Sequence, residues 1–176
     1  MAHHLVITAI GTDRPGISND FIHLVTQMGC NVIDSRIAMF GNEFTIIMLL
    51  SGTANAISKV ESTLPILGQD SDTVTMMKRT SPHIEHIYEY TAEAIIESDD
   101  RPGITEKITH FFATKNIDIS SLSAKTVIDE ESQLDKFHMQ LAVRLDEACN
   151  LMQLQEEFEA HCLKLKVKFS LNFIKH

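Results

Sequence analysis

A five-residue motif that combines an acid, a base, a proline and a glycine occurs twice in the chain. The first copy is Asp13-Arg14-Pro15-Gly16-Ile17, and the second, 87 positions later, is Asp100-Arg101-Pro102-Gly103-Ile104. Each copy follows a short apolar run and precedes apolar residues spaced as on one face of a helix. The motif is therefore predicted at a strand-to-helix turn, where the first main-chain N–H groups of the helix lack partners within it.

Such a turn could bind a small anion or zwitterion. Gly16 carries no side chain, so a ligand can approach the main chain closely. The N–H groups of Gly16, Ile17 and Ser18 are expected at the positive end of the helix dipole, where a carboxylate can bind. Pro15 and Pro102 are expected at the first helical position, where no N–H is needed.

Side chains near the turn could complete the site. Asp13 is placed to cap the helix or to bind an ammonium group, and Asn31, past the helix end, offers a donor and an acceptor. Together they suit an amino acid. The alternative is that Asp, Pro and Gly are ordinary turn residues that both copies need in order to fold. Asp118 replaces Asn31 in the second copy and would repel a bound carboxylate, so the two turns need not be equivalent.

The motif is part of a longer repeated pattern of strands and helices. Runs of strand length are expected at 5–10, 31–40, 44–51 and 73–78, and again at 90–96, 118–128, 137–145 and 165–173. One helix follows each motif, ending at Gly29 or Asn116, and a second is expected at about 55–64 and 147–161. Pro65 is expected to stop the second helix of the first copy, and Gly41-Asn42 to form a tight hairpin.

The order βαββαβ, found twice, predicts an α+β protein with two ferredoxin-like domains, each with both helices on one face of an antiparallel sheet. We expect domains at 1–80 and 87–176, a linker at 81–86, and packing side by side so that sheet edges are paired. The other sheet face must be buried or polar. Four methionines on the strands indicate an apolar face for packing between domains: Met39, Met48, Met76 and Met77.

The charge of the chain argues against direct binding to nucleic acid. The 176 residues include 15 Lys and Arg and 24 Asp and Glu, which gives a formal net charge of −9. Residues 1–80 hold 5 basic and 7 acidic side chains, so both copies are acidic and lack the basic surface that phosphates require. The longest apolar run, 46–50, is also far short of the roughly 20 residues that span a bilayer.

No pattern of residues indicates an enzyme, a metal site or a bound cofactor. The sequence lacks a nucleophile elbow, a P-loop and His-Glu-x-x-His spacing. His83 and His86 lie three apart without further ligands nearby, which favours a solvated linker over a metal site. Cys30, Cys149 and Cys162 are an odd number without close spacing, which is typical of reduced, buried thiols in a cytoplasmic protein.

The motif within a βαββαβ unit resembles the ACT domain, a small regulatory module that commonly binds amino acids at domain interfaces. Longer stretches of the first copy resemble the glycine cleavage system transcriptional repressor family. These stretches are 30–39, 43–52, 55–57, 61–65 and 77–80. In the second copy mainly the motif and the order of elements carry the resemblance.

The resemblance implies a cytoplasmic regulator that responds to an amino acid, with glycine the expected ligand. It would act through a separate DNA-binding activator of the glycine cleavage genes, without binding DNA or a membrane itself. The implied ligand residues are Asp13, Arg14, Pro15, Gly16, Ile17 and Asn31, together with Asp100, Arg101, Pro102, Gly103 and Ile104. The alternative is a tandem scaffold that binds proteins and has no small ligand, and either interpretation allows for a homo-oligomer.

Overall fold

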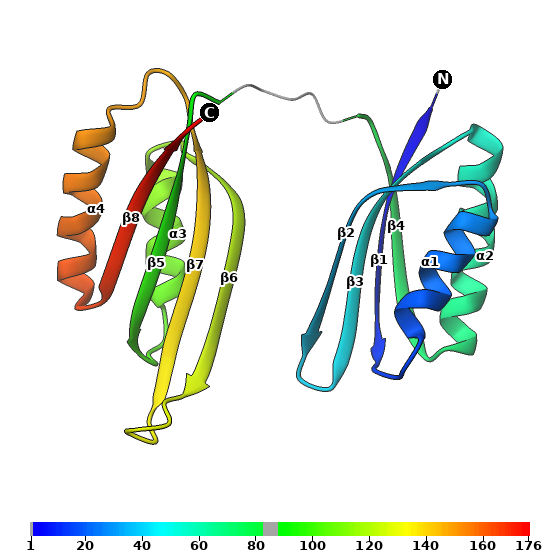
Figure 1. Ribbon diagram of the computed structural model, residues 1–176, viewed down its shortest axis with the longest axis horizontal. Coiled ribbons are helices and arrows are strands. Elements are labelled where there is room, and N and C mark those ends of the chain that lie inside the picture. The colour runs from blue at the N-terminus through cyan, green and yellow to red at the C-terminus, as the bar shows by residue number, and fades with distance from the viewer. Residues whose placement is uncertain (1, 83–87) are drawn as a thin grey trace. The chain divides into compact units, whose positions relative to one another are not determined.

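The computed structural model describes residues 2–82 and 88–176, and the chain divides into two compact units, Met1–Ile84 and Glu85–His176 (Figure 1). We call these unit 1 and unit 2. Most of the predicted linker, and with it His83 and His86, lies outside the described residues.

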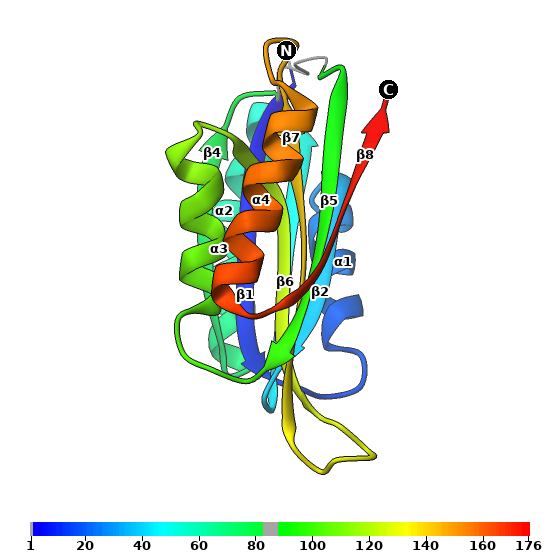
Figure 2. The same ribbon diagram turned by 90° about the vertical axis from the view of Figure 1, so that its left-hand side faces the viewer.

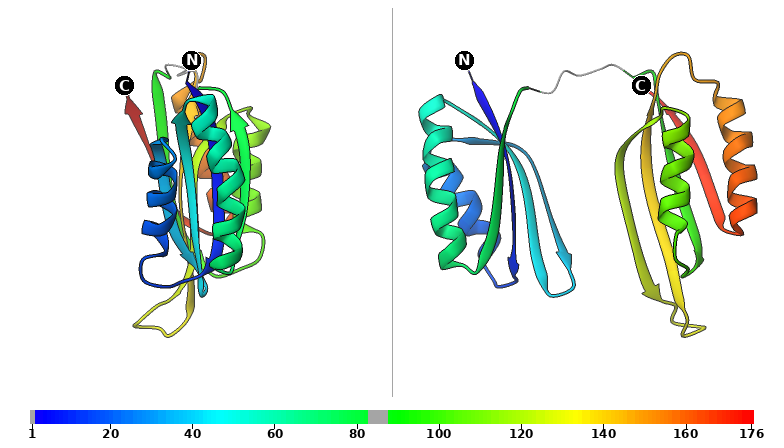
Figure 3. Two further views of the ribbon diagram at one scale, coloured as in Figure 1. Left: turned by 90° about the vertical axis from the view of Figure 1, so that its right-hand side faces the viewer. Right: turned by 180° about the vertical axis from the view of Figure 1, so that it is seen from behind.

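Unit 1 is a four-stranded antiparallel sheet with two helices on one face (Figure 3, left). Its elements are β1 (His3–Thr12), α1 (Ile17–Gln27), β2 (Asn31–Phe40), β3 (Glu43–Gly52), α2 (Ala54–Asp70) and β4 (Thr73–Thr80). The strand order across the sheet is β2-β3-β1-β4. Each helix therefore crosses over the same face, which confirms the predicted α+β arrangement.

Unit 2 repeats this plan, with α3 and α4 side by side over its sheet (Figure 2). Its elements are β5 (Tyr90–Asp99), α3 (Ile104–Thr114), β6 (Asp118–Ile128), β7 (Asp135–Leu145), α4 (Leu151–Leu165) and β8 (Lys168–Lys175). The order β6-β7-β5-β8 matches that of unit 1 position for position.

Alternation along the strands fixes which sheet face the helices cover. In β1, Leu5, Ile7 and Ala9 are fully buried, whereas the residues between them are partly or fully exposed. The buried set packs against the apolar faces of α1 and α2, where the Phe21 ring lies 6.4 Å from that of Phe44. The hydrophobic effect therefore holds helices and sheet together, and the opposite sheet face carries no helix.

The first helix of each unit ends as its sequence predicts. Gly29 and Asn116 both have positive φ, +85° and +57°, which only a few residue types tolerate. The next residue donates its N–H to the carbonyl five positions back, Cys30 to Val25 and Ile117 to Phe112, at 3.1 and 3.0 Å. The Gly41-Asn42 hairpin is also confirmed, because it joins β2 and β3 directly.

Pro65 does not stop the second helix, so that prediction is wrong. Helix α2 runs through Pro65 to Asp70. The proline lies on the exposed side of the helix, where the carbonyl that loses its N–H partner can bind water. On the other side Val60, Leu64 and Gly68 are buried against the sheet, and this packing continues past the proline.

Helix α4 begins later than predicted, at Leu151 and not near 147. The side chain of Asn150 accepts a hydrogen bond from the main-chain N–H of Gln153 at 3.1 Å, so Asn150 is the N-cap. The helix then runs to Leu165, and β8 begins at Lys168, three residues beyond the predicted start. A loop from Asp146 to the N-cap Asn150 consequently separates β7 from α4.

The expected methionine face is only partly correct. Met48 and Met77 belong to the core of unit 1, and Met39 pairs with Phe44 on the same, helix-covered side of the sheet. Met76 alone among the four lies on the face without helices. The period of two along each strand decides this, because neighbouring residues point to opposite faces.

Candidate functional site

The two motif turns have the same main-chain geometry. Gly16 and Gly103 are the N-cap residues of α1 and α3, and each has a φ of +89°. A side chain at this φ would be strained, although a Cβ added there would meet open space within 4 Å. The glycine is therefore required by the path of the chain, and it also leaves the helix start open.

Two details of the predicted turn are wrong. Pro15 and Pro102 precede the N-cap, so neither is at the first helical position, and Ile17 and Ile104 begin the helices. Asp13 does not cap α1 with its side chain. The main-chain N–H of Asp13 instead donates a hydrogen bond to the carbonyl of Asn42 at 3.4 Å.

The expected free amides are fewer than the sequence predicts. The N–H of Ile17 donates to the carbonyl of Arg14 at 3.2 Å and is not available to a ligand. Among the described residues, the N–H groups of Gly16 and Ser18 have no main-chain or side-chain acceptor. These two donors at the start of an 11-residue helix remain a place where a carboxylate could bind.

The two motif arginines bind different groups. Arg14 forms an exposed ion pair with Asp20 in the first turn of α1, at 2.6 Å. Arg101 donates to the carbonyl oxygens of Leu165 and Lys166, at 2.5 and 3.5 Å, at the end of α4. The second arginine thus satisfies carbonyls that a helix end leaves without partners. Asp100 lies beside it, with its N–H donating to the carbonyl of Asp135 at 3.1 Å.

Asn31 does not meet the turn within unit 1. It is the first residue of β2, at the opposite end of α1 from Gly16. A helix of 11 residues is roughly 16 Å long at 1.5 Å per residue, so one glycine molecule cannot contact both ends. The residues that the sequence suggests as one site are therefore divided between two ends of the unit.

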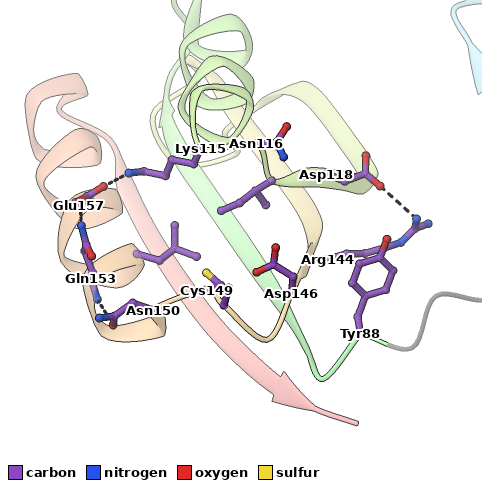
Figure 4. Close-up of a pocket in the computed structure, with 13 residues that line it drawn as sticks. Tyr88, Lys115, Asn116, Asp118, Arg144, Asp146, Cys149, Asn150, Gln153 and Glu157 are labelled. Carbon is purple, nitrogen blue, oxygen red and sulfur yellow. Dashed lines mark hydrogen bonds and ion pairs between the residues drawn. The ribbon is translucent and has the colours of Figure 1, made fainter.

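The equivalent position in unit 2, Asp118, lines a cavity of about 490 Å³ (Figure 4). The cavity lies at the end of unit 2 away from its motif, between the end of α3, the start of β6, and the β7–α4 loop. Its polar and charged lining residues are Tyr88, Lys115, Asn116, Asp118, Arg144, Asp146, Asn150, Gln153 and Glu157. A volume of this size is typical of sites for small molecules.

Four of the five charged groups that line this cavity form two opposed pairs, and Asp146 is a further carboxylate. The Arg144 guanidinium lies 3.2 Å from the Asp118 carboxylate and 5.6 Å from the centre of the Tyr88 ring. On the opposite wall Lys115 pairs with Glu157. Because Arg144 neutralises Asp118, the repulsion of a bound carboxylate expected from the sequence is weakened. The cavity therefore presents both charge signs to a zwitterion.

A second cavity, of about 390 Å³, lies next to the motif of unit 2. Asp99, the residue before the motif, pairs there with Lys136 at 2.5 Å, and this contact lowers the pKa of the Asp99 carboxyl. His138 lies 3.3 Å from Glu97 in the same cavity. Unit 2 thus has charged cavities at both ends of its sheet.

The cysteines fit the prediction of buried thiols, because all three are free and Cys30 and Cys162 are buried. Burial raises the pKa of Cys162 to about 12, so it remains a neutral thiol. Within residues 2–82 and 88–176, no group of His, Cys, Asp and Glu could hold a metal ion. No helix in that part of the chain is long and apolar enough to cross a membrane.

Sequence reasoning missed the large cavity of unit 2. A signal was present, since five residues lie between Leu145 and Leu151, whereas Thr53 alone joins β3 to α2 in unit 1. In unit 1 the end of β3 lies close to Cys30: a Cβ on Gly52 would lie 3.1 Å from the Cys30 sulfur. Comparing loop lengths between the copies would have pointed to the cavity.

Comparisons with known proteins agree with this architecture. The ACT domain family matches residues 3–78. The glycine cleavage system transcriptional repressor of Escherichia coli (strain K12) is 36% identical over 174 residues, which cover 99% of this chain and 92% of that protein. A crystal structure of a protein provisionally given the same name is 57% identical, with a TM-score of 0.74, and covers 100% of this chain and 99% of its own. An unknown protein from Galdieria sulphuraria shares the fold, with a TM-score of 0.77 at 24% identity and 99% of each chain covered.

Proposed function

Because the chain belongs to the family of glycine cleavage system transcriptional repressors, we propose that it lowers expression of the glycine cleavage genes in response to an amino acid. Family membership makes it a transcriptional regulator and not an enzyme. The observation that carries the proposal is identity over both units, since the match to the repressor extends over 99% of the chain.

The regulator is proposed to act by contact with a DNA-binding activator protein. With a net charge of −9 the chain repels phosphate, and binding to DNA would require an excess of basic residues on one surface. Contact with a protein that already binds DNA requires no such surface.

Glycine is the proposed ligand, and the turn at Gly16 is the proposed site in unit 1. Two unpaired N–H groups, of Gly16 and Ser18, can donate hydrogen bonds to the ligand carboxylate, and Asp13 can bind its ammonium group. Arg14, Pro15 and Ile17 shape this turn, and Arg101, Pro102 and Ile104 shape that of unit 2. Glycine has five heavy atoms, and at about 1.5 kcal/mol for each the binding free energy cannot exceed about 7.5 kcal/mol in magnitude. The dissociation constant is therefore expected to be no tighter than a few micromolar.

Calorimetric titration of the full chain with glycine, alanine and serine tests the ligand. We expect binding of glycine, and its loss in Asp13→Ala, whereas Asp70→Ala on the end of α2 serves as a control that keeps it. Arg144→Ala reports separately on the cavity of unit 2. If glycine binds and only Arg144→Ala removes it, the site is the cavity and not the turn. Absence of binding by any of the three amino acids would contradict the proposed response.

A scaffold without a small ligand is the second candidate, and the separation of Asn31 from the turn favours it. A capture experiment separates the scaffold from the ligand-responsive regulator. The chain is immobilised, and binding of the purified activator of the glycine cleavage genes is measured with and without glycine. Capture that changes with glycine supports the ligand-responsive regulator. Capture that glycine leaves unchanged supports the scaffold, and no capture contradicts both.

A further inference from the structure

The sheet of unit 1 has an apolar surface on the side without helices. Six large side chains from all four strands make up this surface, which we call the open face: Ile10, Phe40, Ile47, Leu49, Val74 and Met76. Val74, Phe40 and Met76 are 71%, 68% and 67% exposed. A cluster of large exposed apolar side chains usually marks a surface that a partner covers.

The strand register places the side chains of the open face on one side of the sheet. Thr8 lies opposite Ile47 on β3 and opposite Met76 on β4, while Ile10 lies opposite Val74. Residues paired in this way point to the same side of an antiparallel sheet, with Cβ atoms about 5 Å apart. Ile10 and Val74 are therefore direct neighbours across the sheet, and Thr8 lies between Ile47 and Met76.

Charged side chains around the open face balance one another. Asp34 and Arg36 lie on its β2 edge, Glu43 at the end of β3, and Lys78 on β4. None of the four forms an ion pair with another described residue. The face is thus neutral in a chain whose net charge is −9. Two copies of the chain would repel each other least where these faces meet.

We propose that the open face binds the open face of a second copy of this chain. A symmetric dimer brings the same surface of each copy together, and an apolar, locally neutral face with charges of both signs at its edge is complementary to itself. Arg36 of one copy can then approach Asp34 of the other. Such packing of two sheets about 10 Å apart is the arrangement of a β-sandwich.

The size of the open face suits a dimer. Four strands about 4.8 Å apart, each contributing about eight residues at 3.3 Å, give a surface of roughly 500 Å² before side-chain relief is counted. This is of the same order as the about 800 Å² that each partner buries in a standard interface.

Light scattering on the full chain at micromolar concentrations tests the proposal. The wild type is expected at twice its 19.8 kDa mass. The double variant Val74→Lys/Met76→Ser replaces both residues by the types that unit 2 has at the matching sheet positions. It should weaken dimerisation at least tenfold. The control Ile66→Lys changes an apolar residue on α2 that is also exposed, 58%, and should remain dimeric. Circular dichroism checks that both variants fold.

A monomeric wild type would overturn the proposal, and would mean that another protein or unit 2 covers the face. A double variant as dimeric as the wild type would place the dimer contact elsewhere and overturn it equally. Cross-linking gives an independent measurement, since Met76→Cys adds a thiol on the open face. A bis-maleimide that spans the about 10 Å between packed sheets should join two copies of Met76→Cys, but not of Ile66→Cys or of the wild type. No increase over these controls would contradict the proposal.

Discussion

The two units share their interior and differ on the sheet face that no helix covers. Val6, Ile10, Ile47, Val74 and Met76 lie on that face in unit 1. The residues in the same sheet positions of unit 2 are Glu93, Glu97, Gln140, Lys168 and Ser170. Both sets face away from the helices, so folding places no demand on them beyond compatibility with a strand.

This difference separates what the fold requires from what a partner requires. Inward residues such as Ile7 and Ala94 are apolar in both units, because the helices pack on them. Several outward residues of unit 2 are charged or polar, although Ile95 and Ile174 also lie on this face, 42% and 40% exposed, so the fold does not need a uniformly apolar outer face. The apolar outer face of unit 1 therefore calls for a cover, and the proposed dimer supplies one.

The largest expected effect on stability comes from a substitution in the interior of unit 2. Phe158 is fully buried, and its ring centre lies 5.3 Å from that of Phe111, 5.4 Å from Phe112 and 5.8 Å from Phe169. Phe158→Ala should reduce the free energy of unfolding of unit 2 by about 3–5 kcal/mol, because it leaves a cavity among these rings.

Urea unfolding with hydrogen exchange in β5 and β7 measures the loss. Leu163→Ala, at a 64% exposed position of the same helix, is the matched control and should change stability by less than about 0.5 kcal/mol. Similar losses of stability for the two variants would contradict the view that interior positions matter more for folding than outer ones.

Most of the fold could be predicted from the sequence, because local signals agree with long-range packing. The helix ends at Gly29 and Asn116 could be predicted because these residue types tolerate the positive φ found there. The motif also recurs at the same place in each unit. The prediction failed where packing overrode a local rule, as at Pro65, and where a competing cap decided, as at Asn150. A single residue type does not show that the buried face of α2 continues past Pro65. Nor does it show that Asn150 is the N-cap of α4.

The candidate site was predicted less well, since it depends on distances that sequence spacing does not give. Asn31 is near the motif in sequence but lies beyond the far end of α1. Arg101 bears the same motif position as Arg14, yet it binds carbonyls of α4, which is 64 residues away in the chain. The cavity around Arg144 combines a strand end with a longer loop, and no motif marks it.

The motif arginines give a smaller expected difference between the units. Arg101→Ala should cost unit 2 about 1 kcal/mol, because it leaves the carbonyls of Leu165 and Lys166 without a charged donor. Arg14→Ala should cost unit 1 less than about 0.5 kcal/mol, since the Arg14–Asp20 pair is exposed and screened by water. Urea unfolding of both variants measures this, and equal costs would mean that the motif has one structural role in both units.

The smallest expected effect concerns an ion pair that unit 2 alone has at this position. Asp99 and Lys136 face each other across β5 and β7, whereas Thr12 and Glu43 occupy the matching positions of unit 1. The Lys136 ammonium lowers the pKa of the Asp99 carboxyl below its usual value of about 3.9. Lys136→Met should raise that pKa towards the usual value, as a carboxyl titration by NMR would measure.

The sign of the stability change follows from this direction. Because the folded state holds the Asp99 carboxylate more strongly than the unfolded state, the pair stabilises unit 2 above about pH 3.9, and the contribution is lost as the pH falls through the lowered pKa. Wild type and Lys136→Met should therefore differ slightly at neutral pH, less at high salt, and converge in acid. Lys125→Met on β6 is the control for losing a positive charge. If it moves the Asp99 titration as far as Lys136→Met does, the shift comes from the overall charge of the unit and not from the facing pair.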